Sequence, residues 1–312
     1  MNLHEHKDIF TQYIQATAEY MGLRDAGIVE KDYFVTAFLK RLAEKQPDII
    51  FKGGTSLSKC HKLIKRFSED IDLNVNTGSN RPTEGQRKRL KQDIVCVIDR
   101  LGFSLVNPEQ VRSRRDFNRY VIDYMPASDY LVLKKYLFVE TAVYIKSFPT
   151  ESMDAASFIH DFLCCKNAGD EIIKYGLESF KVQVQSVERT FIDKVFAVGD
   201  YYLSGQAKNH SRHIYDLYKI YPKIVFDSNF NMLVKEVREV RKPHITCHSA
   251  KDGVNLRELL QQAIDEDFYK SDYNQITGTL LFENAPYIEA IAALQQIIKN
   301  DCFLEGNTCC FD

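Results

Sequence analysis

The 312-residue sequence lacks an excess of charge of either sign, a long apolar run and any low-complexity segment. Its 41 basic and 43 acidic side chains leave a formal net charge of -2, so nucleic acid or membrane could be bound only through a local patch. No window of 18 apolar residues is present, which argues against a membrane-spanning helix. The first ten residues do not resemble a secretion signal, so we expect a cytoplasmic protein without membrane contact.

The eight cysteines do not follow the pattern of a disulfide framework or a zinc site. They are scattered along a long chain without a secretion signal, so we expect reduced thiols. A structural zinc site requires paired spacings such as C-x2-C with a second pair, and no such arrangement occurs. The cysteines are Cys60, Cys96, Cys164, Cys165, Cys247, Cys302, Cys309 and Cys310.

Hydrophobic residues make up 45% and charged residues 27% of the chain, which is typical of a globular protein with one large domain or two ordinary ones. Strand-like and helical segments are mixed up to about residue 185, and only helical patterns follow. We therefore predict an α+β domain over residues 1–185, with N-terminal helices and a mixed or antiparallel sheet. Residues 186–312 are predicted to form a helical bundle.

The expected elements follow from periodicity and from helix-capping and turn residues. Thr83 and Gln86, for example, form a capping box for a helix that Gly102 ends. Strands are expected at 49–51, 66–75, 103–106, 120–125 and 136–144. Helices are expected twice before Pro47, from Thr55 to Lys65, after Thr83, and at 186–203, 211–221, 229–240, 256–269 and 287–299.

A pair of glycines follows the short strand at 49–51, in the order Gly53-Gly54-Thr55-Ser56. A strand, two glycines and a helix start leave backbone N–H groups open to phosphate oxygens, because no Cβ is in the way. The same pattern also occurs in ordinary turns. The spacing is not that of a Walker loop.

Two acids, Asp70 and Asp72, fall on one face of the strand expected at 66–75. Arg66 and Ser68 share that face, while the opposite face is apolar. Carboxylates at i and i+2 on a strand lie roughly 6 to 7 Å apart, which suits one or two divalent cations. The alternative is an exposed polar strand end.

A third carboxylate is expected from a neighbouring strand. Glu140 lies within the apolar run at 137–143, where an ionised group is costly unless it is paired or bound to metal. Asp123 is a rival on the same argument. Both residues could also lie on the wet side of an edge strand.

Lys194 is predicted to project from the apolar side of the helix at 186–203, in line with Phe191 and Val198. A cation in that position needs an anionic partner, unless it snorkels from the rim of the core. On the next helix, Arg212 and Asp216 are four residues apart. They could form a surface ion pair or bring a guanidinium to a phosphate.

Taken together, four segments resemble the AbiEii/AbiGii toxin family of nucleotidyltransferases. They are FKGGTSLSK at 51–59, RFSEDIDL at 66–73, Lys194, and RHIYDL at 212–217. The segment VEKDYFVT at 29–36 is similar to the N-terminal helix of that family. His213 stands where the family commonly has a second acid after the arginine.

The resemblance implies a polymerase-β-like nucleotidyltransferase fold, NTP as substrate, two Mg2+ ions, and a toxin role with a separately encoded antitoxin. It implies catalytic roles for Asp70, Asp72, Lys194 and Asp216, with Asp70 and Asp72 as metal ligands. Glu140 is our own choice as third catalytic and metal-binding carboxylate. The implied nucleotide-binding residues are Gly53, Gly54, Thr55, Ser56, Arg66, Ser68, Lys194 and Arg212.

Two basic groups suggest an RNA acceptor, such as a tRNA end, because lysines and arginines can follow a phosphate backbone. The alternative is a solvated surface balanced by nearby acids. Two further functions remain open: transfer to a protein or small molecule, and a non-catalytic NTP-binding interaction module. The basic residues are Arg87, Lys88, Arg89 and Lys91, then Arg112, Arg114, Arg115 and Arg119.

Overall fold

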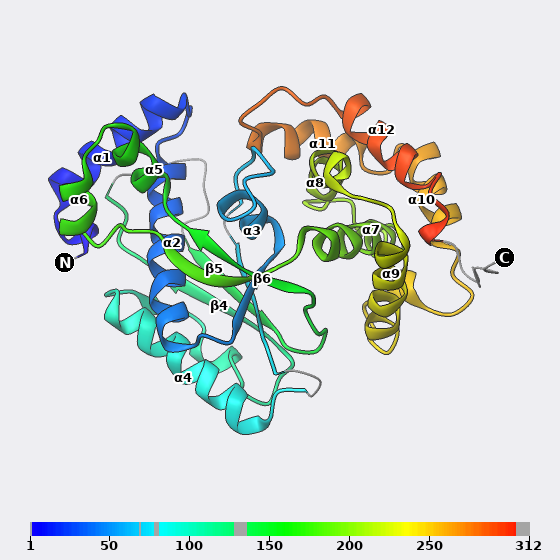
Figure 1. Ribbon diagram of the computed structural model, residues 1–312, viewed down its shortest axis with the longest axis horizontal. Coiled ribbons are helices and arrows are strands. Elements are labelled where there is room, and N and C mark those ends of the chain that lie inside the picture. Colours follow the sequence, from blue (N-terminus) through cyan, green and yellow to red (C-terminus); the bar gives the residue numbers. More distant parts are fainter. Residues whose placement is uncertain (1, 69, 78–80, 128–135, 304–312) are drawn as a thin grey trace. The chain divides into compact units, whose positions relative to one another are not determined.

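A computed structural model describes residues 2–68, 70–77, 81–127 and 136–303 (Figure 1). The chain divides into two compact units. The N-terminal unit comprises residues 1–62 and 67–185, and the C-terminal unit comprises 63–66 and 186–312. A short piece of the first half of the sequence therefore belongs to the second unit. That the units fold as separate domains remains our proposal.

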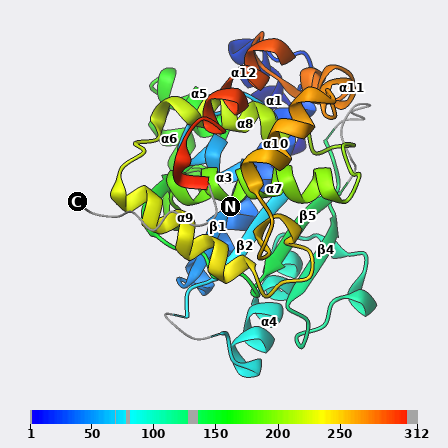
Figure 2. The same cartoon turned by 90° about the vertical axis from the view of Figure 1, so that its right-hand side faces the viewer.

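The N-terminal unit is built on a seven-stranded sheet in the order β3-β4-β5-β2-β1-β7-β6. In Figure 2, β1, β2, β5 and β4 lie beside one another. β1 pairs in parallel with β7 and β2 with β5, while the other pairs are antiparallel, which confirms the predicted α+β class with a mixed sheet. The strands are β1 (Ile49–Lys52), β2 (Asp70–Val75), β3 (Ser104–Leu105), β4 (Phe117–Asp123), β5 (Leu137–Ala142), β6 (Thr150–Ala155) and β7 (Phe180–Gln185).

Helices of the N-terminal unit cover the apolar side of this sheet. Helix α2 contacts α1, α4 and α5 as well as strands β5 and β7. Its Phe34 and Phe38 are buried in one core with Ile71 and Leu73 of β2, because alternate residues of a strand point to the same face. The helices are α1 (Lys7–Met21), α2 (Gly27–Lys45), α3 (Gly53–Lys59), α4 (Glu84–Arg100), α5 (Phe158–Cys165) and α6 (Gly169–Lys174).

Helix α4 begins as its capping box predicts. The Thr83 hydroxyl accepts a hydrogen bond from the Gln86 N–H, and the Gln86 side chain returns to the Thr83 backbone. The predictions at 55–65 and 66–75 are less accurate, because α3 ends at Lys59 and β2 begins at Asp70. Residues 63–66 lie between them and belong to the C-terminal unit.

The C-terminal unit is helical, as predicted. Helix α7 contacts α8, α9 and α10, and α12 contacts α8, α10 and α11. The side chains of Phe191, Val195 and Val198 on α7 are fully buried, as their helical spacing predicts. The helices are α7 (Val187–Leu203), α8 (Arg212–Ile220), α9 (Ser228–Arg241), α10 (Leu256–Asp265), α11 (Lys270–Gln275) and α12 (Tyr287–Ile297).

Two observations concern the membrane and thiol predictions. Across the described ranges, no helix combines the length and apolar character needed to cross a bilayer. Six cysteines are free thiols: Cys60, Cys96, Cys164, Cys165, Cys247 and Cys302. Cys309 and Cys310 lie outside the described residues.

Candidate active site

A row of four charged residues crosses the sheet of the N-terminal unit. Lys52 of β1 is in register with Asp72 of β2, Asp72 with Glu140 of β5, and Glu140 with Arg119 of β4. Residues in register across a sheet share a face and are separated by about 4.8 Å between neighbouring strands. The two acids therefore lie side by side between two cations.

Asp70 lies two residues before Asp72 and so points to the same face. Both acids are half-buried, and their apolar neighbours Ile71 and Leu73 are fully buried on the other face. The polar face predicted from the alternation in sequence is thus present. It leaves the two carboxylates partly accessible to a ligand.

Arg119 is the cation closest to Glu140. Its Nε donates a hydrogen bond of 2.6 Å to Glu140 Oε1, and its Nη2 contacts the same oxygen. The guanidinium also lies 5.4 Å from the ring centroid of Phe138. Burial alone would lower the pKa of Arg119, but the charges of Glu140, Asp70 and Asp72 outweigh it and raise the pKa.

The sheet register distinguishes the two candidates for a third carboxylate. Glu140 is directly opposite Asp72 on the adjacent strand. Asp123 is at the end of β4, four residues beyond Arg119, and four residues of strand span roughly 13 Å. Asp123 Oδ1 is buried without a hydrogen-bond partner. Register therefore favours Glu140 as the neighbour of the aspartate pair.

The glycine turn packs directly against this pair. Gly53 has a φ of +79°, and a Cβ placed there would lie 2.1 Å from Asp72 Oδ2. Only glycine fits, because a side chain would collide with the carboxylate and would also be strained in the left-handed region. Gly54 continues into α3. The turn and Asp72 therefore form one local structure.

The hydroxyl groups after the glycines have structural partners. Thr55 Oγ1 donates a hydrogen bond of 2.5 Å to the Asp70 carbonyl and lies 2.9 Å from Ser68 Oγ. Ser56 is fully buried, and its hydroxyl donates to the Gly53 carbonyl at 2.9 Å. The Thr55 contact joins the turn to the first residue of β2, and the Ser56 contact lies within the turn itself. Any contact of Ser56 with a ligand would require movement of its side chain.

The donor atoms around Asp70 and Asp72 suit Mg2+, which prefers carboxylate oxygens and keeps several waters. In the part of the chain that is described, no three His, Cys, Asp or Glu side chains converge closely enough to hold a metal ion. Glu140 is instead held by Arg119. The site thus offers a pair of acids with a third acid in the next register position.

A second charged cluster lies within the C-terminal unit. Asp216 of α8 is fully buried and accepts hydrogen bonds from Arg66 Nε at 2.6 Å and Arg66 Nη2 at 2.7 Å. Lys194 Nζ of α7 donates to Asp216 Oδ2 at 2.6 Å. Arg66 is 3% and Lys194 5% exposed, so two cations share one anion away from solvent.

The electrostatics of this cluster follow from its charge count. Burial would raise the pKa of Asp216, but Arg66 and Lys194 outweigh it and hold the pKa well below the usual range. Burial lowers the pKa of Lys194, with a further contribution from Arg66, while Asp216 opposes the shift. Among these three residues, two formal positive charges surround one negative charge.

Arg212 and His213 begin α8 beside an aromatic stack. The rings of Tyr201 and His210 are 3.4 Å apart between centroids and nearly parallel, and Tyr201 and His213 are 5.7 Å apart. Burial, and then the nearby charges of Lys194 and Arg212, lower the pKa of His213. The imidazole is therefore neutral at pH 7, unlike an acid in the same place.

Most of the predicted RNA-binding basic residues have partners within the N-terminal unit. Arg87 pairs with Asp116 at 3.0 Å, and Arg114 pairs with Glu84 at 3.1 Å. Lys91 donates to the Val111 carbonyl at 2.8 Å and Arg115 donates to the Gln110 carbonyl at 2.9 Å. Lys88, Arg89 and Arg112 are exposed, and no side-chain partner is found for them within the described ranges.

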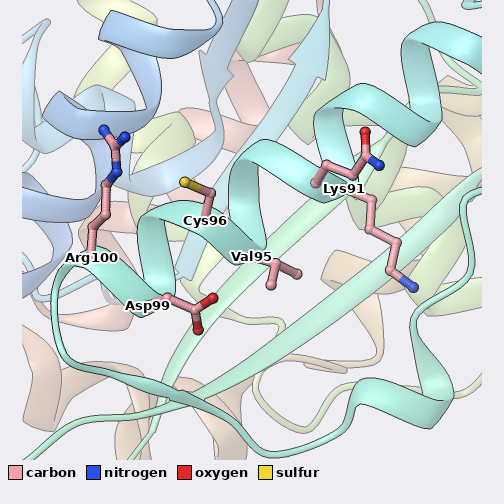
Figure 3. A pocket seen from close by; sticks show the side chains of 6 residues that line it. Lys91, Val95, Cys96, Asp99 and Arg100 are labelled. Atoms are coloured by element: carbon pink, nitrogen blue, oxygen red, sulfur yellow. The ribbon is translucent and has the colours of Figure 1, made fainter.

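Lys91 also borders a hollow on one face of α4 (Figure 3). The hollow is open to solvent and is lined by a single helix, with Lys91 and Arg100 near its two ends. Its lining residues are Lys91, Gln92, Val95, Cys96, Asp99 and Arg100. It shares no residue with either charged cluster.

The structure adds Lys52 and the Arg119–Glu140 contact to the residues that sequence reasoning assembled. In the sequence, Arg119 lies near other arginines, which favours a basic surface. Its contact with Glu140 depends on strand register, which no local pattern in the sequence specifies. The signal that could have found it is its position on the same alternating face as Val121 and Asp123.

The N-terminal unit places paired acids beside a glycine turn on a mixed sheet, and a helical unit follows in the sequence. A protein-family model described as the nucleotidyl transferase AbiEii toxin of a type IV TA system matches residues 37–300. The chain belongs to this family, which confirms the resemblance seen in the sequence.

MenT4, a nucleotidyltransferase toxin from Mycobacterium tuberculosis H37Rv, is a similar solved structure with 15% sequence identity and a TM-score of 0.46. The match covers 91% of this chain and 98% of that chain. No curated protein sequence matches.

Proposed function

We propose that this protein transfers a nucleoside monophosphate from an NTP to an acceptor hydroxyl and releases pyrophosphate. The observation that supports this most is the packing of Gly53 against the Asp72 carboxylate, with Asp70 on the same face. A glycine turn beside paired acids provides a place for phosphate oxygens next to ligands for their counter-ions. Membership of the AbiEii family supports the same reaction.

Each residue has a defined task in this proposal. Asp70 and Asp72 would hold two Mg2+ ions, with Glu140 as a third ligand or proton acceptor, and the backbone at Gly53 and Gly54 would contact the triphosphate. Bound Mg2+ would supply Lewis-acid activation of the acceptor hydroxyl and neutralise charge on the phosphates. Thr55, Ser56 and Ser68 would keep the turn in shape.

The C-terminal unit would contribute charge. Lys194 and Arg212 would offset the negative charge that develops on the leaving phosphates, and removal of such a group costs on the order of 10²-fold in rate. Asp216 would hold the Lys194 ammonium in position. The hydrogen bond of 2.6 Å from Lys194 Nζ to Asp216 Oδ2 supports this role. Arg66 would serve the site through Asp216, because its Nε and Nη2 both donate hydrogen bonds to that carboxylate.

We propose RNA as the acceptor, contacted by the exposed cations of the basic groups. Lys88, Arg89 and Arg112 are the best candidates, since Arg87, Lys91, Arg114 and Arg115 already have partners in the chain. Binding through phosphate contacts should weaken steeply as salt rises. The type IV toxin–antitoxin assignment of the family implies a separately encoded antitoxin as a further partner.

The test is transfer of label from each [α-32P]NTP, with Mg2+ and total RNA. We expect the wild type to label RNA with at least one NTP, and expect Asp70→Asn and Asp72→Asn to reduce labelling by more than about 10²-fold. Both variants should keep their thermal midpoint, because the acids are half-buried rather than core residues.

The matched control is Asp154→Asn. Asp154 is an acid of β6 in the same sheet, 61% exposed and paired with Lys181, and its replacement should leave labelling unchanged. Equal labelling by the wild type and both active-site variants would contradict the proposal. Label on protein or a small molecule, with none on RNA, would reject only the acceptor.

A further inference from the structure

Residues 63–66 are held by the C-terminal unit, although their neighbours in sequence belong to the other unit. Arg66 forms an antiparallel bridge with Leu281, and the Phe282 N–H donates to the Lys65 carbonyl at 2.8 Å. These backbone contacts come from the segment that precedes α12. They fix the backbone of Lys65 and Arg66, from which the Arg66 side chain extends.

Tyr215 adds a side-chain contact to the same stretch. The Lys65 N–H donates to the Tyr215 hydroxyl oxygen at 3.0 Å, and that hydroxyl donates to Glu283 Oε1 at 2.8 Å. The ring is fully buried on α8. Burial, and then Glu283, raise the pKa of Tyr215, so the hydroxyl stays protonated and keeps both bonds.

Asp216 follows Tyr215 on α8, and it binds Arg66, the residue that follows Lys65. Tyr215 contacts the backbone of Lys65, while Asp216 accepts two hydrogen bonds from the Arg66 side chain. Consecutive residues of one helix therefore hold consecutive residues of one extended segment. A bidentate pair requires accurate placement of both partners, and the backbone contact supplies part of it.

Glu283 anchors the tyrosine. It also forms an ion pair with Lys219 at 2.7 Å. Partial burial would raise the pKa of Glu283, but hydrogen bonds from Lys219 and Tyr215 outweigh it and lower the pKa. Glu283 is thus an ionised acceptor that orients the Tyr215 hydroxyl, leaving the lone pairs of that oxygen to receive the Lys65 N–H.

We propose that Tyr215 is a positioning residue for the Arg66–Asp216–Lys194 cluster, with Glu283 as its anchor. The hydroxyl fixes the Lys65 backbone, this places the Arg66 guanidinium on Asp216, and the shared Asp216 carboxylate sets the position of the Lys194 ammonium. The inference rests on the proposed function, in which Lys194 acts on the triphosphate. It adds a residue that touches neither nucleotide nor metal.

The principal variant is Tyr215→Phe, which keeps the ring and removes the hydroxyl. We expect kcat for RNA labelling to fall by about tenfold, because the Lys65 N–H loses its acceptor and the Arg66 guanidinium is placed less accurately, with a smaller change in KM for NTP. The affinity for tripolyphosphate, measured by calorimetry, should also fall, by the same smaller factor as the change in KM. This binding measurement does not depend on turnover.

Variants of Glu283 provide the rescue test. Glu283→Ala should behave like Tyr215→Phe, whereas Glu283→Gln keeps an acceptor oxygen and should stay within about twofold of the wild type in both measurements. Lys219→Met removes the ion pair but leaves the Tyr215 contact, and it should be silent. Equal losses in Glu283→Gln and Glu283→Ala would contradict the anchoring role.

Tyr273→Phe controls for a purely structural effect. Tyr273 is also a fully buried tyrosine of this unit, and its hydroxyl donates to the Ala285 carbonyl at 2.9 Å. Tyr273→Phe should lower the thermal midpoint about as much as Tyr215→Phe does, without lowering kcat or the affinity for tripolyphosphate. If both variants lose activity and affinity equally, Tyr215 is structural and the inference fails.

The outcomes separate this inference from the proposed function. Loss of labelling in Asp70→Asn together with full labelling and binding in Tyr215→Phe would overturn only the inference. If the wild type labels nothing with any NTP, the proposed function fails. Weaker tripolyphosphate binding by Tyr215→Phe would then still support the positioning role.

Discussion

Asp72 in the N-terminal unit and Asp216 in the C-terminal unit are both predicted site residues, but their surroundings differ. Asp72 is half-buried beside a glycine, a second aspartate and Glu140. Asp216 is fully buried between two cations. The first centre gathers acids on a partly accessible face of the sheet, whereas the second encloses one acid between two buried cations of the chain. Their removal should therefore have different consequences.

The largest effect is expected for Asp216→Asn. Removal of the charge leaves Arg66 and Lys194 buried without their shared anion, and breaking a buried pair in this way costs roughly 3–5 kcal/mol in the free energy of unfolding. Urea unfolding should show this loss, and RNA labelling should disappear. Asp70→Asn should abolish RNA labelling without lowering the free energy of unfolding. If both variants unfold at the same urea concentration, the contrast between the two centres is wrong.

Gly53→Ala should have the next largest effect. A left-handed backbone costs a residue with a Cβ roughly 1–2 kcal/mol, and this Cβ must also displace the Asp72 carboxylate. We expect labelling to fall about as far as in Asp72→Asn. Gly102→Ala is the control, because Gly102 also has a positive φ of +71° but has open space around it. It should lose stability while keeping labelling.

The pH dependence of stability offers a third comparison between buried carboxyl groups. Burial raises the pKa of Glu30 in α2 from 4.5 to about 7, although the Ala127 N–H opposes the shift. An acid with a raised pKa stabilises the fold below its unfolded pKa and loses that contribution as pH rises through the folded one. Wild-type stability should therefore fall between about pH 4.5 and 7, by up to about 1.4 kcal/mol per pH unit.

The control for this prediction is Glu30→Gln, which cannot ionise. The difference in unfolding free energy between wild type and variant should change with pH across this window and stay constant above it. Asp216 should contribute no such slope, because its pKa is lowered and its stabilisation is lost only in strong acid. A constant difference from pH 4.5 to 7 would show that folding does not raise the pKa of Glu30.

The smallest effect on stability is expected for Arg119→Leu. The Arg119 side chain is 55% exposed, so its pair with Glu140 should contribute less than about 1 kcal/mol. Release of Glu140 should nevertheless lower the Mg2+ concentration needed for half-maximal labelling by a few fold. Arg114→Leu, which breaks an exposed pair with Glu84, should change neither quantity. An unchanged Mg2+ requirement in Arg119→Leu would remove Glu140 from the metal site.

Local patterns were enough to predict the polar face of β2, the capping box of α4 and the burial of Lys194. Each of these depends on spacing within about ten residues. β6 gave no such signal, because only one of its six residues is buried and its strand conformation depends on pairing with β7. Strand β7 was not predicted either, although it lies inside the sheet and its Val182 and Val184 are buried.

The partners of the site residues could not be predicted in the same way. Arg66 and Asp216 are 150 residues apart in sequence, and nothing near either residue indicates the other. Arg66 was placed on the polar face of a strand, but it precedes β2 and pairs within the C-terminal unit. Sequence reasoning identified the charged residues, and tertiary packing decided which of them meet.

The path of residues 63–66 has a practical consequence for dissection of the protein. A fragment starting at Ser186 would contain Asp216 and Lys194 but would lack Arg66, half of the cationic charge around that carboxylate. It would also lack the backbone that bridges Leu281. Truncation at the apparent junction would thus remove an internal piece of the second unit, and that piece would have to be supplied as a separate peptide to restore the cluster.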